Sequence, residues 1–245
     1  MLAAAEATAE SRTPGGAFRP HSPMRRRIAQ RLLESHQSTA PVTLTTTADA
    51  TNLVNLRSQF RLASAASGQP LPSYNDLILK LTALVLRQHP TFNACWTDDG
   101  LRLLDEIDIA LAVDTDAGLV SPVLRRVDQL GVRALAVESA ALIGRARAGR
   151  LAPADLQDAS FTVTSLGSLG IDAFTPIINP PQVAILGVGR IERKPVYTGD
   201  DRLVPRELMT LSLTFDHRAV DGGPAARFLR AIAEAIAAPA ERLIV

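Results

Sequence analysis

The segment Phe215-Asp216-His217-Arg218-Ala219-Val220-Asp221-Gly222-Gly223 lies between two different hydrophobic patterns. Before it, leucine and phenylalanine alternate with threonine and serine over residues 208–215, which predicts a β-strand. After it, apolar residues recur at helical spacing from residue 224 to residue 236. The segment is therefore a strand-to-helix turn. His217 stands at the strand end, where a side chain is held rigidly and can face a cleft, and Asp221 is placed to cap the helix.

The rest of the chain also mixes the two patterns. Periodicity and β-branched content predict helices over 23–36, 53–66, 73–88 and 130–150 and strands over 41–50, 107–113, 161–165 and 183–188, with a turn and a short strand over 118–124. Strands mixed with long helices indicate an α/β domain with a helix-covered sheet. Residues 1–21 are rich in Ala, Thr, Ser, Gly and Pro and are predicted to be a flexible tail or linker stub, which leaves residues 22–245 as the folded domain.

Composition excludes several classes of function. The 26 basic and 25 acidic residues give a net charge of +1, so no electrostatic footprint for nucleic acid is expected. No apolar run reaches the length of a membrane span. Cys95 is the single cysteine, which excludes a disulfide framework and a cysteine-based zinc site, and no metal is predicted. A reducing compartment, the cytoplasm, is the expected location.

An isolated His-x-x-x-Asp pattern is most simply a buried core histidine followed by a helix cap. A metal site is less consistent with it, because no third ligand lies nearby in the sequence. The neighbouring motifs change this interpretation of His217.

The stretch 216–229 (DHRAVDGGPAARFL) resembles the C-terminal signature of the 2-oxo acid dehydrogenase acyltransferases, the E2 components. These share a fold with chloramphenicol acetyltransferase. Further stretches resemble the family in the same order along the chain: 24–29 (MRRRIA), 89–94 (HPTFNA), 118–123 (GLVSPV), 161–167 (FTVTSLG) and 175–187 (TPIINPPQVAILG). The resemblance implies a chloramphenicol acetyltransferase-like two-layer sandwich, with a mixed β-sheet covered by helices.

The resemblance also implies an activity, the transfer of a short acyl group between dihydrolipoamide and coenzyme A. His217 matches the family's catalytic base, and a neutral imidazole suits deprotonation of a thiol near neutral pH. Thr164 matches the hydroxyl that stabilises the oxyanion. Ser165 is the alternative, although its side chain is expected on the opposite face of the strand. Asp221 matches a structural residue that forms an ion pair with an arginine, for which Arg25 is the matching candidate.

Partners are implied in the same way. Family members form a homotrimer with active sites between subunits, and trimers build larger cubic or icosahedral cores. The lipoyl group is expected from a separate domain or chain, since no Asp-Lys-Ala lipoylation motif occurs here. Gly223 stands where succinyl-specific members tend to carry arginine, which favours an acetyl or branched-chain acyl group. A eukaryotic member would lie in the mitochondrial matrix.

Two alternatives remain open at the level of sequence. The same fold can serve a coenzyme A-dependent O-acetyltransferase that acts on a small hydroxyl acceptor. It can also serve as a non-catalytic scaffold at the core of a complex, although the presence of His217, Asp221 and Thr164 argues against that role.

Overall fold

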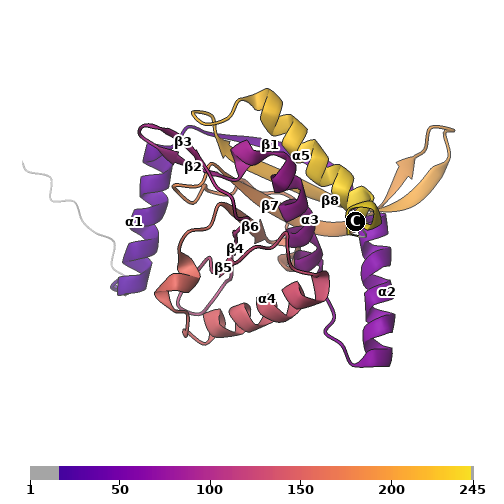
Figure 1. Ribbon diagram of the computed structural model, residues 1–245, viewed down its shortest axis with the longest axis horizontal. Helices are drawn as coiled ribbons and strands as arrows, with labels where there is room; N and C mark the ends of the chain where they lie inside the picture. The colour runs from indigo at the N-terminus through magenta and orange to yellow at the C-terminus, as the bar shows by residue number, and fades with distance from the viewer. Residues whose placement is uncertain (1–16, 244–245) are drawn as a thin grey trace, which may run out of the picture.

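The computed structural model describes residues 17–243 (Figure 1). The helices are α1 (Pro23–Ser38), α2 (Thr51–Ser67), α3 (Tyr74–Gln88), α4 (Val132–Arg147), α5 (Gly222–Ala237) and α6 (Pro239–Leu243). Single 3-10 turns are η1 (Pro90–Phe92), η2 (Pro153–Leu156) and η3 (Gly167–Leu169). The strands are β1 (Pro41–Asp49), β2 (Ala94–Thr97), β3 (Gly100–Leu103), β4 (Ile109–Leu111), β5 (Val123–Leu124), β6 (Phe161–Ser165), β7 (Ala184–Tyr197) and β8 (Leu203–Asp216).

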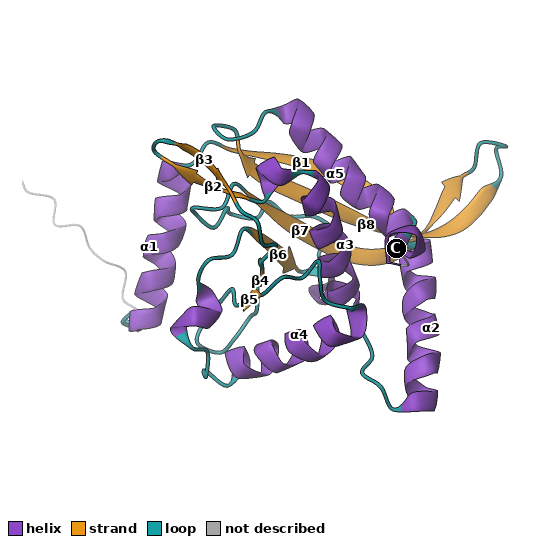
Figure 2. Cartoon of the chain, in the orientation of Figure 1, coloured by secondary structure: helices purple, strands orange, loops and turns teal. Residues whose placement is uncertain are grey.

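Six strands form one mixed sheet in the order β1-β8-β7-β6-β4-β5 (Figure 2). Strands β4, β6 and β7 run parallel to one another, whereas the pairs β1·β8, β7·β8 and β4·β5 are antiparallel. The strands β2 and β3 form a separate hairpin. The predicted α/β class, with a mixed sheet covered by helices, is confirmed.

One face of the sheet is apolar and packs against helices. The aligned residues Leu44, Leu213, Leu186 and Val163 belong to this face, and all but Leu44 are fully buried. Helix α5 packs on β1 and β8, and α3 packs against both α5 and α4. The Phe228 ring of α5 stacks on Phe92, with ring centroids 4.1 Å apart. This stripe of α5 was predicted from its helical spacing.

The opposite face carries small hydroxyl side chains, and we call it the threonine face. Two rows of aligned residues define it: Thr43, Thr214, Ile185 and Thr162 in one, and Thr45, Ser212, Gly187 and Thr164 in the next. The Thr43 and Thr214 hydroxyls are 2.8 Å apart. Cross-strand threonine pairs of this kind stabilise a sheet whose face is not filled by large apolar side chains.

The chain after β6 crosses close over the threonine face, and two glycines of β7 make room for it. A Cβ atom at Gly187 would lie 3.2 Å from the Phe174 ring. A Cβ atom at Gly189 would lie 1.9 Å from the carbonyl oxygen of Asp172. A side chain at Gly189 would overlap the backbone of this segment, and one at Gly187 would press on the Phe174 ring, so the two glycines set the path of the segment over the sheet.

Most predicted elements are present, but two hairpins were missed. Strands β7 and β8 continue as a long ribbon to Tyr197 and from Leu203, beyond the strands predicted over 183–188 and 208–215. This ribbon projects from the body of the molecule (Figure 1). Because much of it is exposed on both sides, it has no alternating apolar pattern to detect. The strands β2 and β3 have four residues each, which is too short for a clear alternating pattern.

The proposed tail lies mostly outside the described residues. Residues 17–21 have no helix or strand, and helix α1 begins at Pro23, where the Ser22 side chain accepts a hydrogen bond from the Arg25 backbone N–H. The Ser-Pro start predicted from the sequence is therefore confirmed.

Candidate active site

His217 lies directly after β8, in the turn that leads into α5. Its backbone N–H donates to the Ala40 carbonyl over 2.9 Å, which ties the turn to the start of β1. Its side chain is 44% exposed, and Nδ1 lies 3.8 Å from Oδ1 of Asp221. His217 is thus not the buried core histidine that the isolated motif would suggest. The imidazole is open to a reaction partner.

Asp221 is the N-cap residue of α5, but its side chain makes no capping hydrogen bond and is 86% exposed. The expected ion pair between Asp221 and Arg25 does not form within one chain. Arg25 lies instead beside Gly118, where Nη2 would be 3.5 Å from a Cβ atom. Arg25 lies in the first turn of α1, which runs from residue 23 to residue 38. His217 lies beside the start of β1, which follows the other end of that helix. The length of α1 therefore separates the two residues.

The histidine turn is held by a different ion pair, between Asp216 and Arg218. The Arg218 Nη2 and Nε atoms donate to the Asp216 carboxylate over 2.6 and 3.0 Å. The backbone N–H groups of Arg218 and Ala40 donate to Oδ1 over 3.0 and 3.2 Å. Burial favours a raised pKa for Asp216, but these hydrogen bonds outweigh it and the pKa lies below its usual value. Asp216 is therefore a buried carboxylate with four partners.

Sequence reasoning missed this pair. The available signal was the presence of opposite charges at positions 216 and 218, on either side of the histidine. Residues 217–219 form a turn, and this turn brings the Arg218 guanidinium back onto the Asp216 carboxylate.

Thr164 lies at the end of β6, on the threonine face. It lines a cavity of about 550 Å³ between the sheet, helix α1 and the segment over residues 174–179. The walls are largely apolar, with Ile28, Val120 and Ile185 among them. Ser165 is aligned with Val188 and Leu211 on the other face and does not line this cavity. Of the two candidate hydroxyl residues, Thr164 lines the cavity and Ser165 does not.

The two predicted catalytic groups lie apart within the chain. Thr164 is aligned with Gly187 and, across β7, with Ser212, which precedes His217 by five residues. At the usual strand dimensions, this is about 16 Å along the strands and about 10 Å across them. His217 is not among the residues that line the Thr164 cavity. Within one chain, the predicted base and the predicted oxyanion donor are therefore not brought into one site.

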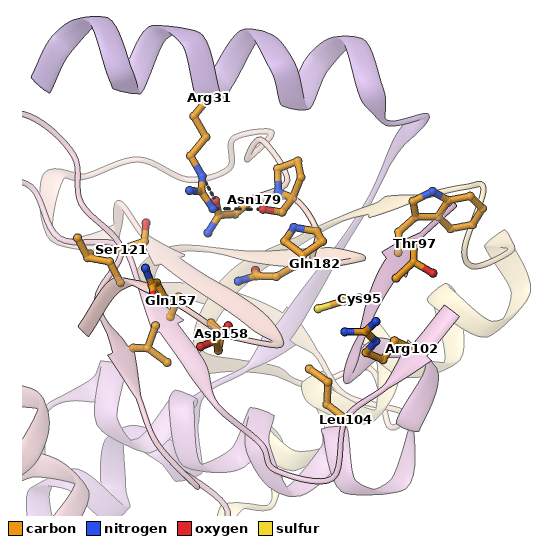
Figure 3. A pocket seen from close by; sticks show the side chains of 17 residues that line it. Arg31, Cys95, Thr97, Arg102, Leu104, Ser121, Gln157, Asp158, Asn179 and Gln182 are labelled. Carbon is orange, nitrogen blue, oxygen red and sulfur yellow. Dashed lines mark hydrogen bonds between the residues drawn. The ribbon is translucent and has the colours of Figure 1, made fainter. Parts of the chain in front are cut away.

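A second, more polar cavity of about 360 Å³ adjoins the first (Figure 3). Arg31 of α1 donates to Oδ1 of Asn179 over 2.8 Å and to the Pro180 carbonyl over 3.2 Å, and both Arg31 and Asn179 line both cavities. Cys95 also lines the second cavity. Burial raises the pKa of its thiol, so Cys95 is protonated near neutral pH and is not an activated nucleophile.

Residues 17–243 contain no group of three or more His, Cys, Asp or Glu side chains placed to hold a metal ion. Within the same residues no helix is long and apolar enough to cross a membrane.

Comparison with known proteins places these features in a family. Residues 16–244 match the family model of the 2-oxoacid dehydrogenases acyltransferase catalytic domain. The acetyltransferase component of the pyruvate dehydrogenase complex of Zymomonas mobilis is 37% identical over 218 residues, which is 89% of this chain and 49% of that protein. The chain spans about half the length of such relatives.

Solved structures agree. The dihydrolipoamide acetyltransferase of Azotobacter vinelandii superposes with a TM-score of 0.91 at 32% identity, covering 99% of this chain and all of that one. In that enzyme, a serine, a histidine and an asparagine four residues after the histidine were investigated for their catalytic role. The cubic core of a pyruvate dehydrogenase multienzyme complex gives a TM-score of 0.90 at 33% identity, with coverage of 99% and 100%. Chloramphenicol acetyltransferase shares the fold, with a TM-score of 0.54 at 15% identity over 84% of this chain and 92% of that one.

The chain has the fold of an acyltransferase and carries an exposed histidine at a strand end. It belongs to the family of 2-oxoacid dehydrogenase acyltransferase catalytic domains.

Proposed function

We propose that this chain transfers an acetyl group between a dihydrolipoyl thiol and coenzyme A. The observation that supports this proposal is that His217 is open at a strand end while Thr164 lines a cavity, both within the residues that match the family model. The relatives compared above are named as acetyltransferases, which supports acetyl as the acyl group. Coenzyme A and the dihydrolipoyl group are both substrates in this proposal. The cytoplasmic or matrix location stays a prediction.

The first step needs a base, because a free thiol is only slightly ionised at neutral pH. The His217 imidazole removes the proton as the thiol sulfur attacks the thioester carbonyl. The C–S bond to the leaving thiol then breaks, and the imidazolium returns the proton to that sulfur. The same histidine therefore serves both directions of the exchange.

The intermediate between these steps carries a negative oxygen. The Thr164 hydroxyl donates a hydrogen bond to it, a contribution of roughly 3 kcal/mol to the barrier when the donor is preorganised. The apolar walls around Thr164 strengthen this hydrogen bond, because they keep the local dielectric low.

The site is completed between two copies of the chain. His217 and Thr164 are too far apart within one chain for one reacting carbonyl to touch both. A homotrimer in which each chain presents Thr164 to the neighbour's histidine satisfies both requirements, as in a heterologous ring. Assembly of trimers into a cubic core is proposed from the likeness to the solved core. Arg25 is on α1, the helix whose residues Met24 and Ile28 line the Thr164 cavity, so its ion pair with Asp221 is proposed to form across this interface.

The lipoyl arm is proposed to come from a separate domain or chain. The described residues contain Lys80 and Lys194 as their lysines. Lys80 is buried in α3 and donates to the Asp128 carbonyl over 2.6 Å, so it cannot carry a mobile arm.

The test is acetyl transfer from acetyl-CoA to dihydrolipoamide by the purified protein. His217→Ala is expected to abolish transfer while the circular dichroism spectrum and oligomeric state stay unchanged. His36→Ala, which changes an exposed histidine of α1, is the control. Full activity of His217→Ala would end the proposal. Isobutyryl-CoA and succinyl-CoA identify the acyl group, and small hydroxyl acceptors separate this activity from O-acetylation.

A further inference from the structure

The reactive side chain at the histidine turn has little to hold it within its own chain. Nδ1 of His217 is 3.8 Å from Oδ1 of Asp221, which is beyond hydrogen-bond distance, and Asp221 is itself exposed. The direction of the imidazole therefore depends on the backbone that carries it.

That backbone is fixed on both sides of the histidine by Asp216. The Asp216 N–H donates to the Val183 carbonyl over 2.8 Å, and its own carbonyl accepts from the N–H groups of Ala219 and Val220. Its carboxylate accepts from the Arg218 side chain and backbone and from the Ala40 N–H. The backbone and carboxylate of Asp216 thus hold the strand end before His217 and the residues that follow it.

Arg218 extends this hold to a second part of the fold. Its guanidinium lies over the Trp96 ring of β2, 4.6 Å from the centroid. The Trp96 backbone N–H donates to the Pro181 carbonyl over 2.8 Å, which anchors the hairpin to the segment before β7. A guanidinium that is both stacked and paired in two hydrogen bonds has a defined orientation, which a lysine could not reproduce.

We propose that Asp216 and Arg218 are positioning residues for His217, and that Trp96 supports the pair. This inference deepens the proposed acyl transfer and rests on it. The pair touches no reacting atom. It sets where the imidazole stands when a thioester arrives from the neighbouring chain. Catalysis needs such placement, because a shift of about 1 Å at the base can cost about a hundredfold in rate.

The variants Asp216→Asn and Arg218→Lys test this role. Asparagine keeps an acceptor for the Ala40 N–H but loses the charge. We expect kcat to fall about tenfold to a hundredfold in Asp216→Asn, with KM for both substrates within about threefold of the original. Arg218→Lys keeps the charge but loses the paired, stacked geometry. Its kcat should lie between that of the unmodified protein and that of Asp216→Asn.

The chain offers a matched control. Asp108 is also a buried aspartate, paired with Arg125 over 2.8 Å and accepting the Arg126 N–H over 2.7 Å, but it lies at the start of β4. Asp108→Asn should lose thermal stability to a similar degree and keep its kcat within about twofold, because β6 and β7 separate β4 from β8 in the sheet.

Hydrogen–deuterium exchange gives a readout that does not depend on activity. In Asp216→Asn, peptides over residues 213–222 should exchange faster, while the other strands stay as protected as before. In Asp108→Asn, exchange over residues 213–222 should be unchanged. Equal kcat losses in Asp216→Asn and Asp108→Asn, or unchanged exchange over 213–222 in Asp216→Asn, would overturn the positioning role. If the unmodified protein proves inactive, the proposed function fails, and the exchange result still decides whether Asp216 holds the turn.

Discussion

Two adjacent residues with hydroxyl side chains, Thr164 and Ser165, show how much depends on which way one side chain points. Successive side chains of a strand alternate between faces, so only one of them can reach the cavity. The sheet register places Thr164 with Gly187 and Ser212 on the threonine face, and Ser165 with Val188 and Leu211. The oxyanion role of Thr164 stays a prediction, which this register supports, and Ser165 is the alternative.

Replacing each hydroxyl separately tests that prediction. Thr164→Ala should lower kcat by about 10²-fold, because it removes the donor to the intermediate. Ser165→Ala should change kcat little, because its side chain does not line the cavity. Steady-state kinetics with acetyl-CoA and dihydrolipoamide measure both. The reverse ranking would transfer the role to Ser165.

Asp216 should also leave a mark on stability at acidic pH. Its pKa is lowered in the folded state, so its contribution is fully present above the unfolded-state value of about 3.9 and is lost as the pH falls through the folded-state value. Asp216→Asn should cost about 3 kcal/mol at neutral pH, since it removes one partner of a buried pair. Urea unfolding at pH 7, 5, 4 and 3 should show this cost shrinking only below pH 4. A cost that stays constant to pH 3 contradicts the assignment.

The residues predicted from motifs and those found only in the structure differ in kind. His217 and Thr164 could be predicted because short motifs carry them, and the structure places each at an accessible position. The hydrogen bonds by which Asp216 holds the histidine turn could not be predicted, because its partners include Ala40 and, through Arg218, Trp96. Sequence spacing does not report contacts between such distant positions.

At the scale of elements, the segment over residues 172–176 depends on strand β7 beneath it. Asp172 lies so close to Gly189 that its carbonyl occupies the space of a side chain, and the Arg190 N–H donates to the Ile171 carbonyl over 2.8 Å. The same segment supplies Phe174 and Pro176 to the wall of the Thr164 cavity. The glycines of β7 thus shape the cavity from below.

Gly189→Ala should therefore displace this segment. We expect a loss of about 3 kcal/mol in unfolding free energy, at the upper end for an overpacked site, together with reduced kcat. Gly199→Ala is the control, because no atom lies within 4 Å of its Cβ position and its backbone is not left-handed. Chemical denaturation of both variants measures the difference, and equal stability would show that the segment can yield.

Helices and buried strands were predictable because one face of each is buried and leaves a period in the sequence. Helix α3, for example, begins at the predicted Ser73 cap, where Asp76 completes a capping box. The ribbon of β7 and β8 beyond the body, around Lys194 and Tyr197, is exposed and leaves no such period. Its strand pairing follows from the adjoining sheet rather than from its own residues.

At the scale of the whole molecule, the central feature is the distance between His217 and Thr164. One chain carries both the base and the oxyanion donor, but the two lie on separate parts of the sheet. The proposed chemistry therefore requires that neighbouring copies complete each other's sites. Activity should belong to the assembly and be lost on dissociation.

Co-expression of His217→Ala and Thr164→Ala chains tests this requirement most directly. Each variant alone should be nearly inactive. In a mixed ring, a Thr164→Ala chain supplies an intact histidine and a neighbouring His217→Ala chain an intact threonine, so about a quarter of the sites regain both groups at equal mixing. Recovery of acetyl transfer to about a quarter of the unmodified rate is the predicted result. Mixed assemblies no more active than the two separate variants would contradict a site shared between chains.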